Sequence, residues 1–372
     1  MQEKISNIGL ALSGGGIRAT IFHLGILKYL AEINWLEKVS RISSVSGGSI
    51  AVGLIYSLND NKWPTSKEYL EKVLPKAKEL ILHKDLEKNA LLRLIGKPWS
   101  INNRANVLSE SLNKYWKIQG NLKDLPAYPK WIINATSYET GQNWRFTYKN
   151  MGDNVAGFVP TPLLPISDAV ASSAAFPGLI SPYALKTDKH PWYQYDKKNN
   201  KRIDINQKFN VMHLWDGGVY ENLGVEALFV NGTLHEKIDF LIVSDASKEL
   251  ENEALPNILL YKKFLRLVDI AMDQIRCIKT REVKDYIRIH PNKGLFFKIG
   301  DSKKFIVEHS RFLSANKQMT FLNEEEAAFV ENYRTTLAKP TEKNFNLILR
   351  HGYEVAMVTT ECYITYPSAR CL

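Results

Sequence analysis

The sequence feature that most constrains the fold is a serine between an apolar, β-branched run and a pair of glycines. Residues 42–50 read Ile-Ser-Ser-Val-Ser-Gly-Gly-Ser-Ile. We interpret the run as a buried strand that ends at Ser46, and the uncharged residues 50–58 as a buried helix. A sharp strand-to-helix turn requires small neighbours, here Gly47 and Gly48, and presents the serine hydroxyl at the edge of a sheet. The stretch therefore predicts either a nucleophilic Ser46 or an ordinary polar turn.

Composition narrows the class of protein. The chain has 372 residues, of which 45% are hydrophobic and 24% charged, as is usual for a globular protein with a large core. Its 49 Lys and Arg residues exceed its 39 Asp and Glu residues, which gives a formal net charge of +10. This surplus is compatible with a nucleic acid partner, with an anionic membrane surface, or simply with solubility.

The cysteines and the apolar segments indicate a compartment. The three cysteines are widely spaced and include no Cys-x-x-Cys pair, which argues against a disulfide framework and favours a reducing compartment. The first residues carry no apolar signal region, and no stretch is long and apolar enough to span a bilayer. We therefore expect a cytoplasmic protein without a signal peptide or transmembrane helix, which can also associate peripherally with a membrane.

A glycine-rich loop precedes the serine. Residues 8–12 form a short apolar run, Gly14, Gly15 and Gly16 follow it, and a helical spacing of apolar residues begins at Thr20. This order of strand, glycine loop and helix leaves backbone N–H groups unobstructed at a helix start. Such groups can bind a phosphate or a developing oxyanion.

Four interpretations compete for this loop. A dinucleotide site formally fits Gly14-x-Gly16-x-x-Ala19, but it also requires an acidic residue at the end of the next strand, which ends in Ser46. A P-loop is excluded because no Gly-Lys-Ser/Thr sequence follows the glycines. An oxyanion hole suits a serine at the following turn. A tight glycine turn without a chemical role is the fourth interpretation.

A carboxylate later in the chain is the second candidate element. Residues 209–215 are strand-like, and Asp216, Gly217 and Gly218 follow directly. The glycines allow close backbone approach, so Asp216 can be held against the end of a neighbouring strand. The alternative is a glycine-rich β-turn opened by an aspartate.

These motifs resemble those of the patatin-like phospholipase family. The resemblance rests on Ser-Gly-Gly-Gly-Ile-Arg-Ala at 13–19, Ser-Val-Ser-Gly-Gly-Ser at 44–49 and Asp-Gly-Gly at 216–218. Residues 134–141 are similar to the family's Asn-Ala-Thr…Glu-Thr-Gly hairpin, and residues 171–177 to its Ala-Ser-x-Ala-x-Pro segment. The family's nucleophile turn usually reads Gly-x-Ser-x-Gly. Here a serine replaces the first glycine, and serine is small enough for the same turn.

The resemblance implies a fold and a mechanism. The fold is a three-layer α/β architecture with a central, mostly parallel sheet and helices on both faces. The mechanism is a dyad without histidine, in which Ser46 attacks an ester carbonyl and Asp216 accepts the proton as general base. The oxyanion hole would comprise Gly14, Gly15 and Gly16, and the supporting motif positions would be Gly47, Gly48, Gly217 and Gly218.

Several other polar residues are candidates for lesser roles. Arg18 belongs to the first motif and either steadies the glycine loop, meets a lipid phosphate or forms an ordinary salt bridge. His23 lies on the first predicted helix, where a packed histidine is a simpler interpretation than a third catalytic group. His213 precedes Asp216 by three residues in a strand and should point to the opposite face. Asp168 lies at a predicted helix start, where acidic residues usually cap. No His or Cys cluster indicates a metal, and we expect no cofactor.

We expect residues 1–372 to form one acyl-hydrolase domain. Its core motifs fall at about 8–250, with a helical insertion at about 60–125 and a helical region at about 257–372. The tail region includes a long helix predicted at 261–283.

This long helix is predicted to bury Leu267, Ile270 and Ala271 and to expose Arg276 among several cations. Such cations indicate either a surface that faces lipid or nucleic acid, or a solvated face.

The sequence therefore predicts a serine acyl hydrolase of membrane lipids, of the phospholipase A or lysophospholipase type. One alternative is an esterase or thioesterase that acts on other acyl donors. Another alternative is a basic protein that binds nucleic acid or lipid without catalysis. Nucleic acid binding is disfavoured because no helix-turn-helix, RNP or zinc-finger pattern is present. The expected partner is a membrane phospholipid or another lipid ester, together with an anionic membrane surface.

Overall fold

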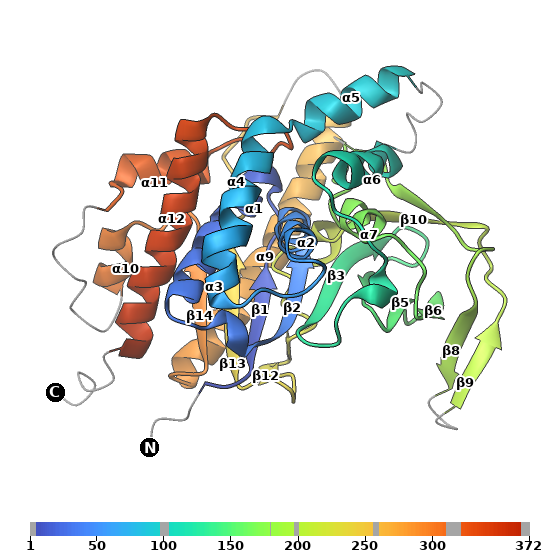
Figure 1. The fold of residues 1–372 in the computed structure, drawn as a ribbon, viewed down its shortest axis with the longest axis horizontal. Helices are drawn as coiled ribbons and strands as arrows, with labels where there is room; N and C mark the ends of the chain where they lie inside the picture. The colour runs from blue at the N-terminus through green and yellow to red at the C-terminus, as the bar shows by residue number, and fades with distance from the viewer. Residues whose placement is uncertain are drawn as a thin grey trace.

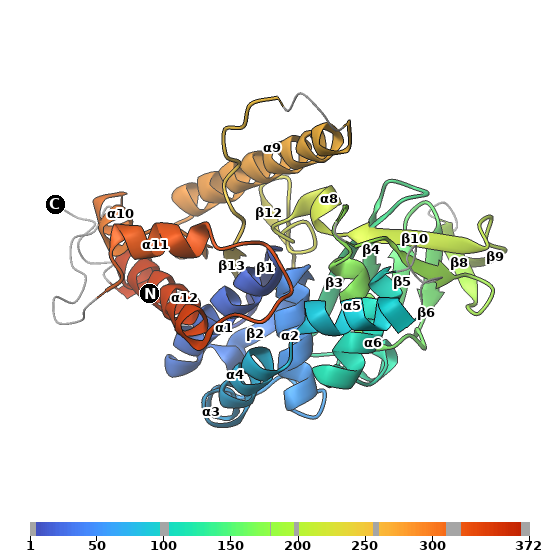
Figure 2. The same ribbon diagram turned by 90° about the horizontal axis from the view of Figure 1, so that it is seen from above.

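The protein has three layers, with a central sheet between two sets of helices (Figures 1 and 2). This computed structural model describes residues 5–96, 104–178, 180–196, 201–255, 260–309 and 321–365. The layered α/β architecture and the parallel centre of the sheet confirm the predicted fold class. No helix in these ranges is long and apolar enough to cross a membrane.

Five parallel strands form the centre of the sheet. Their order is β14 (Gly294–Lys298), β13 (Phe240–Asp245), β1 (Ile8–Leu12), β2 (Val39–Val45) and β3 (Lys130–Ser137). Every residue of β1, β2 and β13 is buried. Their near-continuous small and apolar sequences are typical of parallel strands with helices on both faces. The strand β14 lies in the region predicted to be helical; its five residues were too few to show a period.

Antiparallel strands extend the sheet beyond β3. In sheet order they are β4 (Asn143–Phe146), β5 (Asn150–Asp153), β6 (Gly157–Pro160), β8 (Trp192–Asp196) and β9 (Lys201–Ile205). The strands β10 (Val211–Asp216) and β7 (Tyr183–Lys186) pair with each other, and β10 also pairs with β3. Alternate residues of β10 are buried, so His213 and Asp216 lie on opposite faces.

The register of β10 places it in line with β2. In β3, Asn134 pairs with Val45, the last residue of β2. The next residue, Ala135, pairs with Asp216, the last residue of β10, and on its other side with β4. The strands β2 and β10 therefore lie on the same side of β3 and meet end to end. This arrangement brings Ser46, which follows Val45, close to Asp216.

Helices cover both faces of the parallel centre. In Figure 2, one side carries α1 (Gly16–Glu32), α2 (Gly47–Leu58), α4 (Leu74–His83) and α12 (Glu342–Thr360), and the other carries α8 (Gly218–Glu221) and α9 (Leu260–Ile289). The helices α5 (Leu86–Gly96), α6 (Arg104–Tyr115) and α7 (Ile166–Ser173) lie toward the antiparallel strands. Shorter elements include α3 (Ser66–Glu68), α10 (Lys303–His309), α11 (Glu324–Glu331) and the β11–β12 hairpin (Phe229–Val230, Thr233–Leu234).

The helix α9 is oriented differently from the prediction. Leu267, Ile270 and Ala271 are exposed, whereas Arg276 is buried, so the predicted inside and outside are wrong for these residues. The Arg276 guanidinium pairs with Asp245 Oδ2 at 3.1 Å and with Asp273 Oδ1 at 2.6 Å. A buried carboxylate such as that of Asp245 requires a paired cation, and this pairing directs the charged side of α9 inward.

The helices α1 and α12 pack at backbone distance. A Cβ atom at Gly25 would lie 2.0 Å from the carbonyl oxygen of Leu349, and one at Gly352 would lie 2.2 Å from that of Phe22. Only glycine allows this approach at both positions. The crossing fixes α1, whose first residue belongs to the glycine loop, against the C-terminal helix.

We predict that Gly352→Val destabilises the protein by about 3 kcal/mol, because the added atoms must separate α1 from α12. Thermal or urea unfolding followed by circular dichroism measures the change. Ala328→Val, at an exposed position of α11, is the matched control and should change stability by less than about 0.5 kcal/mol. Equal stability of the two variants would contradict the predicted backbone contact.

Candidate active site

Ser46 occupies a strained turn between β2 and α2. Its backbone has φ 48° and ψ −115°, in the left-handed half of conformational space that non-glycine residues rarely adopt. Its side chain is nearly buried but lines the main cavity. The first residue of α2 follows directly, so the positive end of the helix dipole favours negative charge near the Ser46 oxygen.

The two glycines after Ser46 let the turn pack against the glycine loop. A Cβ atom at Gly47 would lie 2.3 Å from the carbonyl oxygen of Gly16, and one at Gly48 would lie 2.4 Å from that of Leu12. The Gly48 amide donates a hydrogen bond to the Ser13 carbonyl at 3.1 Å. Any larger side chain would push the two loops apart.

Ser44, which replaces the family's usual glycine, is part of a buried hydrogen-bond network. Its hydroxyl accepts a hydrogen bond from the Trp131 indole at 2.9 Å and lies 2.9 Å from the Ser49 hydroxyl. Ser49 in turn lies 2.8 Å from the Ser173 hydroxyl. The departure from the family pattern is therefore accommodated, because the additional hydroxyl has polar partners.

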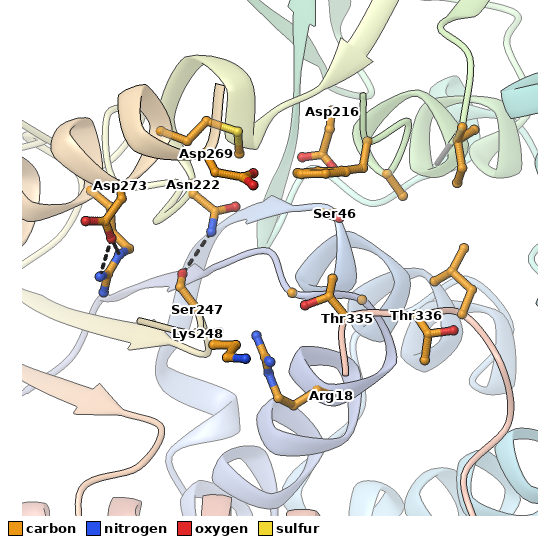
Figure 3. A pocket seen from close by; sticks show the side chains of 18 of the residues that line it. Arg18, Ser46, Asp216, Asn222, Ser247, Lys248, Asp269, Asp273, Thr335 and Thr336 are labelled. Carbon is orange, nitrogen blue, oxygen red and sulfur yellow. Dashed lines mark hydrogen bonds and ion pairs between the residues drawn. The ribbon is translucent and has the colours of Figure 1, made fainter. Parts of the chain in front are cut away.

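Asp216 is buried at the end of β10. Its Oδ1 atom accepts a hydrogen bond from the Gly218 amide at 2.7 Å, while Oδ2 is buried and has no well-formed hydrogen bond with a described residue. Burial raises the pKa of Asp216 to about 7, and hydrogen bonding from the Gly218 amide and the Ser46 hydroxyl opposes this rise. Ser46 and Asp216 are neighbours in Figure 3. Close packing requires Gly217, where a Cβ atom would lie 2.5 Å from the Asn134 carbonyl oxygen.

The C-terminal end of α7 holds both residues. The Ser173 carbonyl accepts hydrogen bonds from the Ser46 amide at 3.1 Å and the Gly217 amide at 3.3 Å. The Ala175 carbonyl accepts one from the Asp216 amide at 3.0 Å. The sequence identified residues 171–177 as similar to a family segment, but it did not identify Ser173 as the contact residue.

The glycine loop offers fewer free amides than predicted. The Gly14 amide donates to the Asn222 carbonyl at 3.1 Å, so it is not available to a substrate oxyanion. The backbone φ angles of Gly15 and Gly16 are 139° and 61°. Neither amide donates a hydrogen bond to a described residue. The predicted set of three donors is thus corrected to Gly15 and Gly16. Asn222 was not identified from the sequence.

A C-terminal strap, which we define as residues 331–337, packs against the glycine loop. The Ile17 amide donates to the Thr336 carbonyl at 2.8 Å. The Arg18 guanidinium donates to the carbonyls of Glu331 at 3.0 Å, Tyr333 at 2.6 Å and Ala246 at 3.1 Å. These backbone contacts bury Arg18 and favour the interpretation that it steadies the loop. Burial lowers its pKa to about 10, while Asp245 and Glu331 oppose that shift.

The remaining polar candidates have structural partners. His23 is buried, with Nδ1 2.8 Å from the Ser244 hydroxyl and Nε2 2.9 Å from the Ser13 carbonyl, and burial lowers its pKa to about 4. It is therefore a neutral packed residue at neutral pH. His213 Nδ1 lies 2.7 Å from Glu139 Oε1. Asp168 accepts a hydrogen bond from Ser109. Among the described residues, no three His, Cys, Asp or Glu side chains form a group that could hold a metal ion.

Comparison with known proteins identifies the family. A family model described as patatin-like phospholipase matches residues 10–229, more than half of the chain. The chain belongs to the patatin-like phospholipase family. The matched segment of this patatin-like chain contains Ser46, Asp216 and the glycine loop, but not the C-terminal strap.

Relatives and solved structures agree with this assignment. Patatin-like phospholipase domain-containing proteins of Aspergillus terreus and Aspergillus oryzae are 24% identical over 253 residues, covering 67% of this chain and 30% of each relative. The chain thus spans about a third of their length. Human GIVD cytosolic phospholipase A2 aligns with a TM-score of 0.53 and 14% identity, covering 97% of this chain and 59% of that one. Its complex with methyl gamma-linolenyl fluorophosphonate and terbium chloride aligns with a TM-score of 0.55 and 12% identity, covering 100% of this chain and 60% of that one. At these identities the structural likeness establishes the fold.

The patatin-like site opens into a cavity of about 700 Å³ with both charged and apolar lining residues. The segment after β13 and the helix α9 supply Lys248, Arg266, Asp269, Asp273 and Arg276, together with the apolar Leu250 and Met272. The helices α5 and α6 and the segment after α7 supply Leu86, Ala90, Leu108, Phe176 and Ile180, together with the charged Glu87 and Arg104. In Figure 3, Ser46 lies between Asp269 and Asp273 on one side and Thr336 of the strap on the other. The cavity can therefore accept an amphiphilic molecule.

The raised pKa of Asp216 predicts a specific pH dependence of stability. In the unfolded chain the Asp216 carboxyl loses its proton above about pH 4. In the folded protein it keeps that proton up to about pH 7. The stabilisation from the protonated carboxyl is complete below that interval and is lost as the pH rises through it. Asp216→Asn cannot ionise at this position. We therefore expect its free energy of unfolding, taken relative to that of the wild type, to increase by roughly 3 kcal/mol from pH 4 to pH 8.

Urea unfolding at several pH values measures this difference. Asp204→Asn, at an exposed position of β9, is the control and should follow the wild type at every pH. A constant difference between Asp216→Asn and the wild type from pH 4 to pH 8 would show that Asp216 titrates normally.

Proposed function

We propose that the chain is a serine acyl hydrolase of lipid esters, of the phospholipase A or lysophospholipase type, that uses Ser46 and Asp216 as a dyad. The observation that carries this proposal is the buried carboxylate of Asp216, whose Oδ2 lacks a well-formed hydrogen bond, beside the strained Ser46. A buried carboxylate with a raised pKa next to a nucleophile is the arrangement expected of a general base.

In the acylation step, Ser46 Oγ forms a bond to the ester carbonyl carbon while its proton passes to Asp216. The carbonyl oxygen becomes an oxyanion, which the amides of Gly15 and Gly16 stabilise. One such donor typically contributes about 3–4 kcal/mol to transition-state stabilisation. Asp216 then returns the proton to the leaving alcohol as the tetrahedral intermediate collapses to the acyl-enzyme.

In the deacylation step, water replaces the alcohol. Asp216 accepts a proton from the water, which attacks the acyl carbonyl, and then returns a proton to Ser46 Oγ as the carboxylic acid leaves. A pKa near 7 suits this alternation, because the group must gain and lose a proton at neutral pH.

The cavity supports a lipid as the substrate. Its apolar lining residues suit an acyl chain, its charged lining residues suit a polar head group, and Ser46 lines the same cavity. The family to which the chain belongs gives the same substrate class. We further propose that residues 1–372 act as one catalytic unit, because the strap after α11 contacts the glycine loop directly.

We predict that Ser46→Ala lowers kcat by at least about a thousandfold and abolishes covalent labelling by a fluorophosphonate probe. Ser57→Ala, on the same helix α2 but away from the cavity, should retain both properties. Hydrolysis of phosphatidylcholine, lysophosphatidylcholine, triglyceride and acyl-thioester substrates measures the activity and separates phospholipase from esterase or thioesterase action. Equal hydrolysis by the wild type and Ser46→Ala would refute the proposal.

The pH profile tests the role of Asp216. Only the ionised carboxylate can accept a proton, so kcat/KM should rise with pH, inflect at about 7 and level off above it. A soluble ester such as p-nitrophenyl butyrate reports this profile. The residual activity of Asp216→Asn should lack the inflection, and an inflection retained in Asp216→Asn would exclude Asp216 as the titrating base.

A further inference from the structure

The outer side of α9 carries large apolar side chains that are open to solvent. Phe264, Leu267, Ile270 and Ile278 are 62%, 64%, 37% and 55% exposed. At about 100° per residue, these four fall within an arc of about 120° around the helix. We call them the α9 apolar face. Apolar residues gathered on one face mark an interaction surface, whereas singly scattered ones are ordinary.

The inner side of the same helix lines the catalytic cavity. Asp269, Met272 and Arg276 are among its lining residues, and at about 100° per residue they lie on the side opposite the α9 apolar face. In Figure 2, α9 runs along one edge of the molecule, above the parallel strands. A surface that α9 contacts would therefore lie one helix diameter from the cavity.

The charges beside this face favour an anionic partner. In the described part of the chain, the ion pairs of α9 cations involve Arg276, Lys279 and Arg288. Lys263, at the start of α9 next to Phe264, falls within the same arc and forms no ion pair with a described residue. A helix with exposed apolar side chains and a lysine on the same side has the composition of an interfacial helix, and the chain has a formal net charge of +10.

We propose that the α9 apolar face docks the protein on the surface of an anionic lipid bilayer. Phe264 and Leu267 enter the boundary between head groups and acyl chains, and Lys263 contacts the anionic head groups. A second copy of the chain suits this face less well, because a symmetric dimer would bring the lysines of both copies together. The benefit to catalysis rests on the proposed function, but the docking itself does not require hydrolysis.

Co-sedimentation with vesicles tests the docking. Full-length Ser46→Ala protein, which cannot consume the lipid, is mixed with vesicles of phosphatidylcholine alone or of phosphatidylcholine with phosphatidylserine. We expect preferential binding to the anionic vesicles. The additional changes Phe264→Ser and Leu267→Ser should together weaken that binding by about tenfold or more, since each removes apolar surface from the interface. Lys263→Glu should weaken binding to the anionic vesicles only.

A matched control distinguishes binding through the α9 apolar face from binding through any exposed apolar side chain. Phe329 on α11 is 47% exposed, and Phe329→Ser should bind as tightly as the parent protein. Equal binding by Phe329→Ser and by the Phe264→Ser, Leu267→Ser variant would overturn the proposal. A dimer, detected by light scattering and dissociated by Phe264→Ser with Leu267→Ser, would assign the face to a second copy instead.

Hydrolysis of soluble p-nitrophenyl butyrate keeps this test independent of the proposed function. With Ser46 intact, Phe264→Ser and Leu267→Ser should leave that activity unchanged, because neither side chain lines the cavity. This result also shows that the variant is folded. If the wild type binds vesicles but cleaves no ester, the proposed function fails while the docking stands. If it cleaves the soluble ester but does not bind anionic vesicles, the docking fails alone.

Discussion

The site depends on the register with which β2 and β10 pair with the same side of β3. The strand β2 stops opposite Asn134, and β10 arrives from the other direction and stops opposite Ala135. Their ends therefore meet, and Ser46 lies near Asp216 although 170 residues separate them in the chain. A slip of one residue in the pairing of β10 would turn Asp216 to the opposite face of the sheet. The proximity of Ser46 and Asp216 is thus a property of strand pairing, which rigid, buried elements maintain.

Backbone contacts hold the loops around this point. The turn at Ser46 touches the glycine loop through Gly47, and the end of α7 binds the amides on both sides of the dyad. The glycine loop is in turn held by the strap and by the crossing of α1 with α12 at Gly25. Because glycines and carbonyl groups make these contacts, little side-chain rearrangement can occur. The backbone amides of Gly15 and Gly16 are therefore held in place, which the proposed oxyanion hole requires.

Burial sets the chemistry of the site. Asp216 is removed from water, so its ionised form is disfavoured and its pKa rises to about 7, although the hydrogen bond from the Gly218 amide opposes this rise. Asp245, which is also buried, is instead paired with Arg276. That pairing directs the charged side of α9 toward the cavity and leaves Phe264 and Leu267 on the outside. The buried Asp245–Arg276 ion pair thus determines which side of α9 lines the cavity and which side is exposed to solvent.

The sequence by itself determined the local elements: the strand before Ser46, the glycine loop before α1, and the strand that ends at Asp216. Short-range periodicity and the need for small residues at sharp turns are sufficient to identify these. Only the tertiary structure decided that the Gly14 amide donates a hydrogen bond to the Asn222 carbonyl and that Ser173 and the strap hold the loops. It also decided that α9 turns its apolar side outward. The physical reason is that these features depend on hydrogen bonds and ion pairs between segments far apart in the chain. No local pattern specifies which distant carbonyl or carboxylate will be the partner.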